Sequence, residues 1–218
     1  MGGGEKVLYK ILEALFEDKP RLIEMMSKEF HIAIYVDSTA SEKEILARVK
    51  ARFNIDLPEH AIKFIRITRG KYLGQNYFNC MTLLLQGLSS SLVILEALIK
   101  YPSDLLFDSM GFGWIYPVAK LVCPNIKILS YSHYPFISSD MIKKVESGVE
   151  DYNNSESISK SSFKSKLKLL YYKLILMLYR FVGRFVDLVM ANSTWTYNHF
   201  YSLWHLTNDS LCKLYESI

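Results

Sequence analysis

The run Ser130-Tyr131-Ser132-His133-Tyr134-Pro135 joins an apolar segment to a proline-containing turn and carries a histidine at the junction. An imidazole titrates near neutral pH, so His133 could transfer a proton or hydrogen-bond a sugar hydroxyl or a developing charge. In open parallel sheets, ligands collect at the carboxyl ends of strands. His133 is therefore a candidate catalytic residue, although a lone histidine is more often a hydrogen-bonded structural residue.

Three more polar residues occupy similar places in the sequence. Asp108 and Ser109 end another apolar run, and Asp140 follows His133 in the same polar segment. These side chains could line one crevice with His133. They could equally cap the helices that follow, as Ser and Asp at a helix start do routinely.

A triple glycine, Gly2-Gly3-Gly4, stands directly before a helical pattern that begins at Glu5. Backbone N–H groups there could approach a pyrophosphate closely, and the helix dipole would favour its negative charge. Gly3 and Gly4 are thus candidate donor-phosphate ligands. The alternative is a flexible leader with no binding role.

The elements that must position these residues alternate between strand and helix. Short β-branched runs predict strands at 31–36, 61–67, 105–108, 126–131 and 185–191. Apolar residues at helical spacing predict helices at 5–17, 41–53, 75–100, 113–121, 162–184 and 193–204. This order favours a doubly wound, mostly parallel sheet of Rossmann-like type. A glycine-rich phosphate loop normally follows a buried strand, so the first, central strand is expected to be missing, with unpaired edges or imperfect closure as the result.

The predicted helix at 162–184 carries a narrow basic stripe, with Lys166, Lys173 and Arg180 at heptad spacing and Arg184 one turn further. Its remaining surface is rich in Leu and Tyr, which suits the headgroup boundary of a bilayer. The alternative is a crossover helix packed on the sheet with its basic edge in water. The apolar segment 81–99 is interrupted by polar residues, which argues against a membrane span.

Composition narrows the remaining classes of protein. Apolar residues make up 50% of the 218-residue chain, which is ample for a packed core and excludes wholesale disorder. The net charge is only +4, and no stacked-aromatic RNA signature accompanies it, so no nucleic-acid partner is expected. Three scattered cysteines lack zinc-ligand spacing, so reduced thiols and no metal site are predicted.

Taken together, several tracts resemble the N-terminal half of the dolichol-pathway, GDP-mannose-dependent α-1,2-mannosyltransferases, which are of glycosyltransferase family 4 type. The resemblance covers the chain to about Trp204. It is carried by Gly2-Gly3-Gly4-Glu5-Lys6-Val7-Leu8, by Asp108-Ser109-Met110-Gly111 with Tyr116-Pro117, by the tract from Tyr131 to Met141, and by Asn192-Ser193-Thr194-Trp195-Thr196-Tyr197-Asn198-His199 with Leu203-Trp204.

The resemblance implies a GT-B fold, in which two Rossmann-like halves face one another across a cleft, and catalysis without a metal or other cofactor. It places Gly3 and Gly4 near the phosphates of the donor GDP-mannose and His133 near the transferred sugar. It also implies a dolichyl-diphosphate oligosaccharide as acceptor, which receives its fourth and fifth mannoses on the cytosolic face of the endoplasmic reticulum membrane. Other mannosyltransferases of the pathway are expected as partners. Membrane contact by the helix at 162–184 becomes the favoured interpretation.

Departures from the family pattern set the expected domain organisation. Residues 1–206 are predicted to form the acceptor-side domain with a mobile insertion at 143–166, and 207–218 an atypical tail. The family's N-terminal anchor, first strand and C-terminal donor domain have no counterpart in the sequence, so the chain is expected not to turn over by itself. The alternative function is a non-catalytic membrane-associated module that binds dolichol-linked sugar or a partner glycosyltransferase. A free-standing nucleotide-binding domain is disfavoured because GxGxxG with a following acidic residue is lacking.

Overall fold

The computed structural model describes residues 3–37, 39–73, 78, 81–134, 162–204 and 211–213. Strand and helix alternate along most of this chain, as predicted. The strands are β1 (Ile32–Val36), β2 (Ile62–Arg66), β3 (Leu105–Asp108), β4 (Lys127–Ser132), β5 (Leu188–Ala191) and β6 (Leu211–Lys213). The helices are α1 (Gly3–Glu17), α2 (Lys19–Met26), α3 (Glu42–Phe53), α4 (Thr82–Lys100), α5 (Ile115–Val122), α8 (Ser162–Val182) and α9 (Thr194–Trp204), with short 3-10 turns such as η1 (Glu59–Ala61) and η4 (Gly183–Phe185).

All strand pairs within the described ranges are parallel, which confirms the predicted α/β class with a Rossmann-like arrangement. The strands form two sheets, one of β1 and β2 and one in the order β3-β4-β5-β6. One continuous sheet would need hydrogen bonds between β1 and β3, and these strands are not paired. Within the described residues, the parallel sheet expected from the sequence is therefore divided into two sheets.

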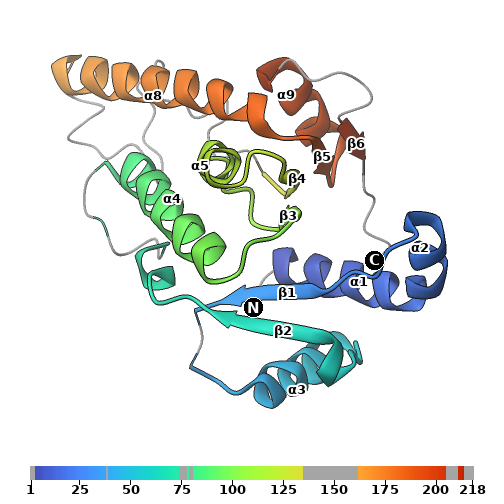
Figure 1. Ribbon diagram of the computed structural model, residues 1–218. Helices are drawn as coiled ribbons and strands as arrows, with labels where there is room; N and C mark the ends of the chain where they lie inside the picture. Colours follow the sequence, from blue (N-terminus) through green and yellow to red (C-terminus); the bar gives the residue numbers. More distant parts are fainter. Residues whose placement is uncertain are drawn as a thin grey trace.

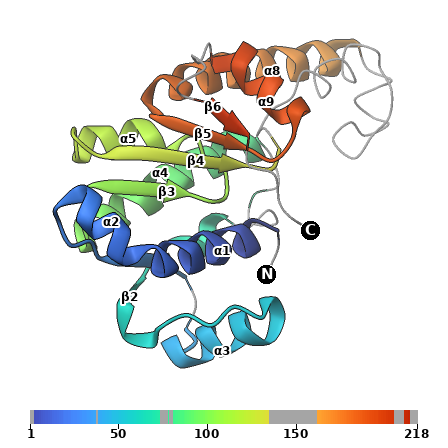
Figure 2. The same ribbon diagram turned by 90° about the vertical axis from the view of Figure 1, so that its right-hand side faces the viewer.

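Helix α1 joins the two sheets by packing against both. Tyr9 and Leu12 belong to a buried cluster with Ile34 of β1, whereas Val7 packs with Tyr131 of β4 and Met190 of β5. Figures 1 and 2 both show α1 between the β1-β2 pair and the larger sheet. The burial of apolar side chains on both sides of α1 fixes this helix, and therefore its first turn, relative to the strand ends of the larger sheet.

The main hydrophobic core lies around the larger sheet. Buried side chains from α4, α5, α8 and α9 pack on β4 and β5; fully buried members include Tyr116, Ile128, Ile175, Tyr179, Val189 and Phe200. Helix α8 contributes only one face to this core, because its buried residues Tyr172, Ile175 and Tyr179 recur on that face. The opposite face of α8 remains on the molecular surface.

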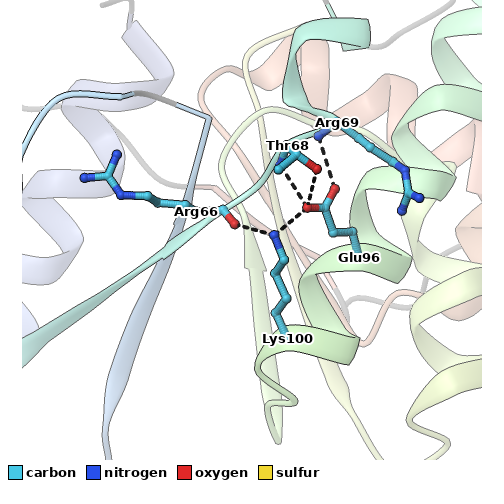
Figure 3. A network of polar contacts seen from close by, with 5 residues as sticks. All are labelled: Arg66, Thr68, Arg69, Glu96 and Lys100. Carbon is cyan, nitrogen blue, oxygen red and sulfur yellow. Dashed lines mark hydrogen bonds and ion pairs between the residues drawn. The ribbon is translucent and has the colours of Figure 1, made fainter.

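A polar network ties the exit of β2 to α4 (Figure 3). The carboxylate of Glu96 accepts hydrogen bonds from the backbone N–H and hydroxyl of Thr68, from the backbone N–H of Arg69, and from Lys100 Nζ at 2.6 Å. Lys100 also donates to the Arg66 carbonyl at 2.8 Å. Since Glu96 is only 7% exposed, this network replaces water that the carboxylate lost on folding.

Some features of the fold were not predicted. The strand β6 lies in the segment 207–218 that was expected to be a tail, and it extends the larger sheet beside β5. Helix α2 was also missed. Residues 143–161 of the predicted insertion lie outside the described residues, and α8 already begins at Ser162. Cys123 is a free, half-buried thiol.

Candidate functional site

The first turn of α1 lies against the turn after β3 and against the histidine after β4. A Cβ atom added to Gly4 would stand 2.8 Å from the Ser109 carbonyl oxygen and 3.8 Å from His133 Nε2. The first distance is too short for any side chain, so glycine is required here for close approach rather than for flexibility. The structure thus brings together Gly4, Ser109 and His133, which the sequence separates widely, while Gly3 is the first residue of the same helix.

This cluster has the electrostatic character of an anion site. The first N–H groups of a helix have no intrahelical acceptor, and the helix dipole adds partial positive charge at the same end. The imidazole of His133 lies beside this first turn, because its Nε2 would be 3.8 Å from a Cβ atom placed on Gly4. A phosphate with a sugar attached could meet helix N–H groups and an imidazole at once.

His133 is held by residues from β4, β5 and α9. Its ring packs edge-on against the buried ring of Tyr131, with centroids 4.8 Å apart and planes at 88°. Its Nδ1 lies 3.4 Å from Asn192 Nδ2, and its carbonyl oxygen accepts a hydrogen bond from Thr196 Oγ1 at 3.2 Å. Side chain and backbone are therefore both fixed at the carboxyl ends of two neighbouring strands.

Asn192 and Thr196 form one hydrogen-bonded group with His133. Thr196 Oγ1 lies 3.3 Å from the amide of Asn192, and the same amide lies 3.4 Å from His133 Nδ1. The single hydroxyl proton of Thr196 is donated to the His133 carbonyl, so the direction of the hydrogen bond between amide and imidazole depends on the tautomer of the ring. In either tautomer, Nε2 lies on the side of Gly4.

Asp108 organises the turn after β3 from inside the protein. Its carboxylate accepts hydrogen bonds from the backbone N–H groups of Met110 and Gly111, at 2.9 and 3.1 Å, and from the Tyr116 hydroxyl at 2.8 Å. Gly111 has a left-handed φ of 74°, which glycine adopts without strain. Asp108 is 5% exposed, so it shapes the turn that presents Ser109 to α1 and does not itself line an open crevice.

Burial and charge shift the pKa values of Asp108 and Tyr116. Burial raises the pKa of Asp108, against the opposing effect of its hydrogen bonds from Met110 and Tyr116. Burial also raises the pKa of Tyr116 well above its usual value, and the neighbouring Asp108 charge adds to the shift. The Tyr116 hydroxyl, which also lies 2.6 Å from Ser130 Oγ, therefore stays protonated and can donate to Asp108.

Three of the basic residues predicted on the long helix lie on α8, and Arg184 lies in η4 directly after it. Lys166, Lys173, Arg180 and Arg184 are all exposed. Between them runs an exposed apolar stripe: Leu167 (58% exposed), Leu170 (65%), Leu174 (44%), Met177 (58%) and Phe181 (49%). No acidic residue occurs within α8. We call these nine residues the α8 surface.

Other predicted or chemically relevant residues fall elsewhere. Asp140 lies outside the described residues, so its prediction stays open. Within the described ranges, no group of three or more His, Cys, Asp or Glu could hold a metal ion. A surface hollow of about 270 Å³ is lined by residues of α3, of η1 and of the loop between them, including Lys43, Leu57 and Glu59, and so belongs to a different part of the chain from His133.

The sequence analysis named Asn192 and Thr196 in a tract that carries the family resemblance but missed their contacts with His133. Ser193 does cap α9, because its Oγ accepts a hydrogen bond from the Thr196 N–H at 3.1 Å. Asn192, which precedes this cap, and Thr196, which follows it, nevertheless contact His133. The available signal was that β4 and β5 are consecutive parallel strands, whose carboxyl-end turns must lie side by side.

One helix within the described ranges, α4, is long and apolar enough to cross a membrane, and 33% of that stretch is buried inside the protein. In this structure, α4 is hydrogen-bonded to other parts of the protein. The Leu84 N–H of its first turn donates a hydrogen bond to the Tyr171 hydroxyl of α8 at 3.1 Å, and Glu96 joins α4 to Thr68, which follows β2. The sequence prediction that this segment does not span a membrane stays a prediction.

Comparisons with known proteins agree with the geometry. The family described as ALG11 mannosyltransferase N-terminus matches residues 1–204. A relative from Dictyostelium discoideum is 36% identical over 203 residues, which are 93% of this chain and 38% of the relative. A relative from Mus musculus is 38% identical over 214 residues, 95% of this chain and 41% of the relative. Both are named GDP-Man:Man(3)GlcNAc(2)-PP-Dol alpha-1,2-mannosyltransferase, and the chain spans about two fifths of their length.

Proposed function

The chain belongs to the family of ALG11 mannosyltransferase N-termini, and we propose that it supplies the acceptor-side half of an enzyme that transfers mannose from GDP-mannose, in α-1,2 linkage, to a dolichyl-diphosphate-linked oligosaccharide. The observation that supports this most directly is the meeting of Gly4, Ser109 and His133 at the first turn of α1. A donor diphosphate and the sugar attached to it need such a pairing of helix N–H groups with a neighbouring imidazole.

In this proposal, catalysis comes from positioning and from stabilisation of charge. As the bond from the mannose C1 to the diphosphate breaks, positive charge develops on the sugar and negative charge on the departing diphosphate. The N–H groups at Gly3 and Gly4 would stabilise the diphosphate. His133, with Nε2 on the side of Gly4, would hydrogen-bond the transferred sugar or a phosphate oxygen. Metal-independent chemistry remains our expectation for this site.

We also propose that the protein acts at the cytosolic face of the endoplasmic reticulum membrane, with the α8 surface against the bilayer. A stripe of exposed Leu, Met and Phe next to Lys and Arg buries apolar area below the headgroups while the cations meet lipid phosphates. The absence of acidic residues within α8 removes the main source of repulsion from anionic lipid. A lipid-linked acceptor presents its sugars at this same boundary.

The function can be tested with an enzyme in which residues 1–204 of this chain replace the matching region of the Dictyostelium discoideum relative, here called the chimera. We expect the chimera to transfer mannose from GDP-mannose to Man(3)GlcNAc(2) carried on dolichyl diphosphate. A chimera that folds and binds membranes but transfers no mannose would contradict the proposal. That result would instead support a non-catalytic, membrane-associated module that binds dolichol-linked sugar or a partner glycosyltransferase.

A further inference from the structure

Three aromatic rings form a row on the surface beside His133. The rings of Tyr134 and Trp195 are stacked, with centroids 5.1 Å apart and planes at 19°. Trp195 also stacks on His199 one helical turn further along α9, with centroids 5.5 Å apart and planes at 18°. Tyr134 is 56% exposed and Trp195 is 44% exposed.

The row does not contribute to the hydrophobic core. Trp204, on the same helix as Trp195, is only 5% exposed and packs among Tyr116, Tyr179 and Phe200. Exposed aromatic rings leave apolar surface in water, which costs free energy unless a ligand covers it. Tyr134 and Trp195 are therefore better placed for binding than for stability.

The backbone links this row firmly to the candidate site. Tyr134 follows His133 directly, and Trp195 precedes Thr196, whose hydroxyl donates to the His133 carbonyl at 3.2 Å. The same turn contributes Asn192, which contacts the imidazole. The two rings and His133 are therefore carried by the same two turns, after β4 and after β5.

We propose that Tyr134 and Trp195 form a stacking platform for a mannose ring of the acceptor oligosaccharide. Pyranose rings carry a face of C–H groups that packs on aromatic rings, while their hydroxyls need polar partners at the edge, as in other mixed sites. The inference rests on the proposed function, because it names the part of the acceptor that this site holds.

The platform suits the acceptor sugar better than the guanine base of the donor. In GDP-mannose, the base is separated from mannose by ribose and two phosphates. With the phosphates at Gly4 and the transferred mannose at His133, the base lies on the far side of the diphosphate. The accepting mannose, in contrast, must bring a hydroxyl to C1 of the transferred sugar and so must lie next to His133.

The first test is binding of the free pentasaccharide Man(3)GlcNAc(2) to the 218-residue chain, measured by isothermal titration calorimetry for every variant and by NMR of the Trp195 indole in the wild-type chain. We expect saturable binding that weakens at least about tenfold in Trp195→Ala and in Tyr134→Ala and is retained in Trp195→Phe. Tyr201→Ala is the matched control, because Tyr201 is 48% exposed on the same helix and stacks on Tyr197 instead. Circular dichroism verifies that each variant is folded.

The second test is steady-state kinetics of the chimera. Trp195→Ala is expected to raise KM for the lipid-linked acceptor about tenfold and to leave KM for GDP-mannose unchanged. Equal pentasaccharide binding by the wild-type chain and Trp195→Ala would overturn the platform, as would a response of Trp195 to GDP alone. If the pentasaccharide binds as expected but the unsubstituted chimera transfers no mannose, the proposed function fails while the sugar platform stands.

Discussion

Asn192 Nδ2 lies 3.4 Å from His133 Nδ1, and this contact joins the turn after β5 to the turn after β4. The amide thereby orients the imidazole, with Nε2 on the side of Gly4. Thr196 holds the amide in place, because its hydroxyl lies 3.3 Å from Asn192 Oδ1. A residue outside the cluster at Gly4 therefore fixes the orientation of the His133 ring.

Replacing Asn192 should disturb His133 without removing it. In Asn192→Leu we expect the chimera to lose about 10- to 100-fold in kcat, with little change in either KM, because a positioning contact is lost. The ¹⁵N chemical shifts of the His133 ring distinguish this effect from general destabilisation. They should report one dominant tautomer in the wild-type chain and a tautomer mixture in Asn192→Leu. Unchanged shifts together with reduced kcat would contradict the positioning role.

The close approach at Gly4 predicts a strong effect of the smallest possible substitution. The added methyl group of Gly4→Ala would lie 2.8 Å from the Ser109 carbonyl, so α1 or the turn after β3 must move. We expect a loss of about 1–3 kcal/mol in the free energy of unfolding and a larger, at least about 100-fold, loss of mannosyl transfer. Lys10→Ala on the exposed side of α1 is the control. Equal transfer by Gly4→Ala and Lys10→Ala would refute the close-packed site.

The Glu96 network predicts a pH-dependent contribution to stability. Burial alone would raise the pKa of Glu96, but hydrogen bonds from Lys100, Thr68 and Arg69 outweigh it and lower the pKa from 4.5 to about 2. A lowered carboxyl pKa stabilises the folded state above the unfolded-state pKa, and this stabilisation is lost as the pH falls through the folded-state value. In urea unfolding, Glu96→Gln should cost about 1–3 kcal/mol at pH 7.

The difference between wild type and Glu96→Gln should shrink as the pH falls from about 4.5 to about 2, since the wild-type carboxylate then becomes protonated. Glu13→Gln serves as the control, because Glu13 pairs with Lys10 on the surface of α1 and should change stability by less than about 0.5 kcal/mol. A difference between wild type and Glu96→Gln that stayed constant across this pH range would show that the charge of Glu96 is not what holds the network.

The α8 surface predicts salt-sensitive membrane binding. In flotation with vesicles that contain phosphatidylinositol, Leu170→Glu combined with Leu174→Glu should reduce the bound fraction at least about fivefold, since both apolar burial and charge become unfavourable. Lys173→Glu with Arg180→Glu should weaken binding mainly at low salt. Met25→Glu changes an equally exposed side chain on α2 and should have no effect. Flotation that is the same for all four proteins would refute the membrane role of α8.

Much of this fold is predictable from the sequence because its signals are local. The β-branched run around Ile34 and the buried run from Lys127 to Ser132 predict strands directly, and Ser41 with Glu44 forms the capping box that starts α3. Helix α2 contains Pro20 and has no buried residue, so periodicity could not reveal it. The split into two sheets could be anticipated only as imperfect closure, because sheet pairing depends on tertiary contacts.

The candidate site was predictable in part for the same reason. Gly4, Ser109 and His133 stand at strand or helix ends, where a parallel fold gathers polar groups. The roles of Asp108 and Trp195 depend on side-chain direction. Asp108 points into the turn, where Tyr116 donates to it, while Trp195 points to the surface and stacks on Tyr134. Neither direction follows from spacing alone.

The most direct test of the account is His133→Ala in the chimera, assayed for transfer of mannose to lipid-linked Man(3)GlcNAc(2). We predict at least about a 100-fold loss of kcat, with thermal stability and membrane binding close to those of the unsubstituted chimera. Tyr201→Ala, which changes an exposed ring of α9 outside the site, should retain full activity. Near-normal turnover by a folded His133→Ala chimera would contradict the assignment of this histidine to the transferred sugar.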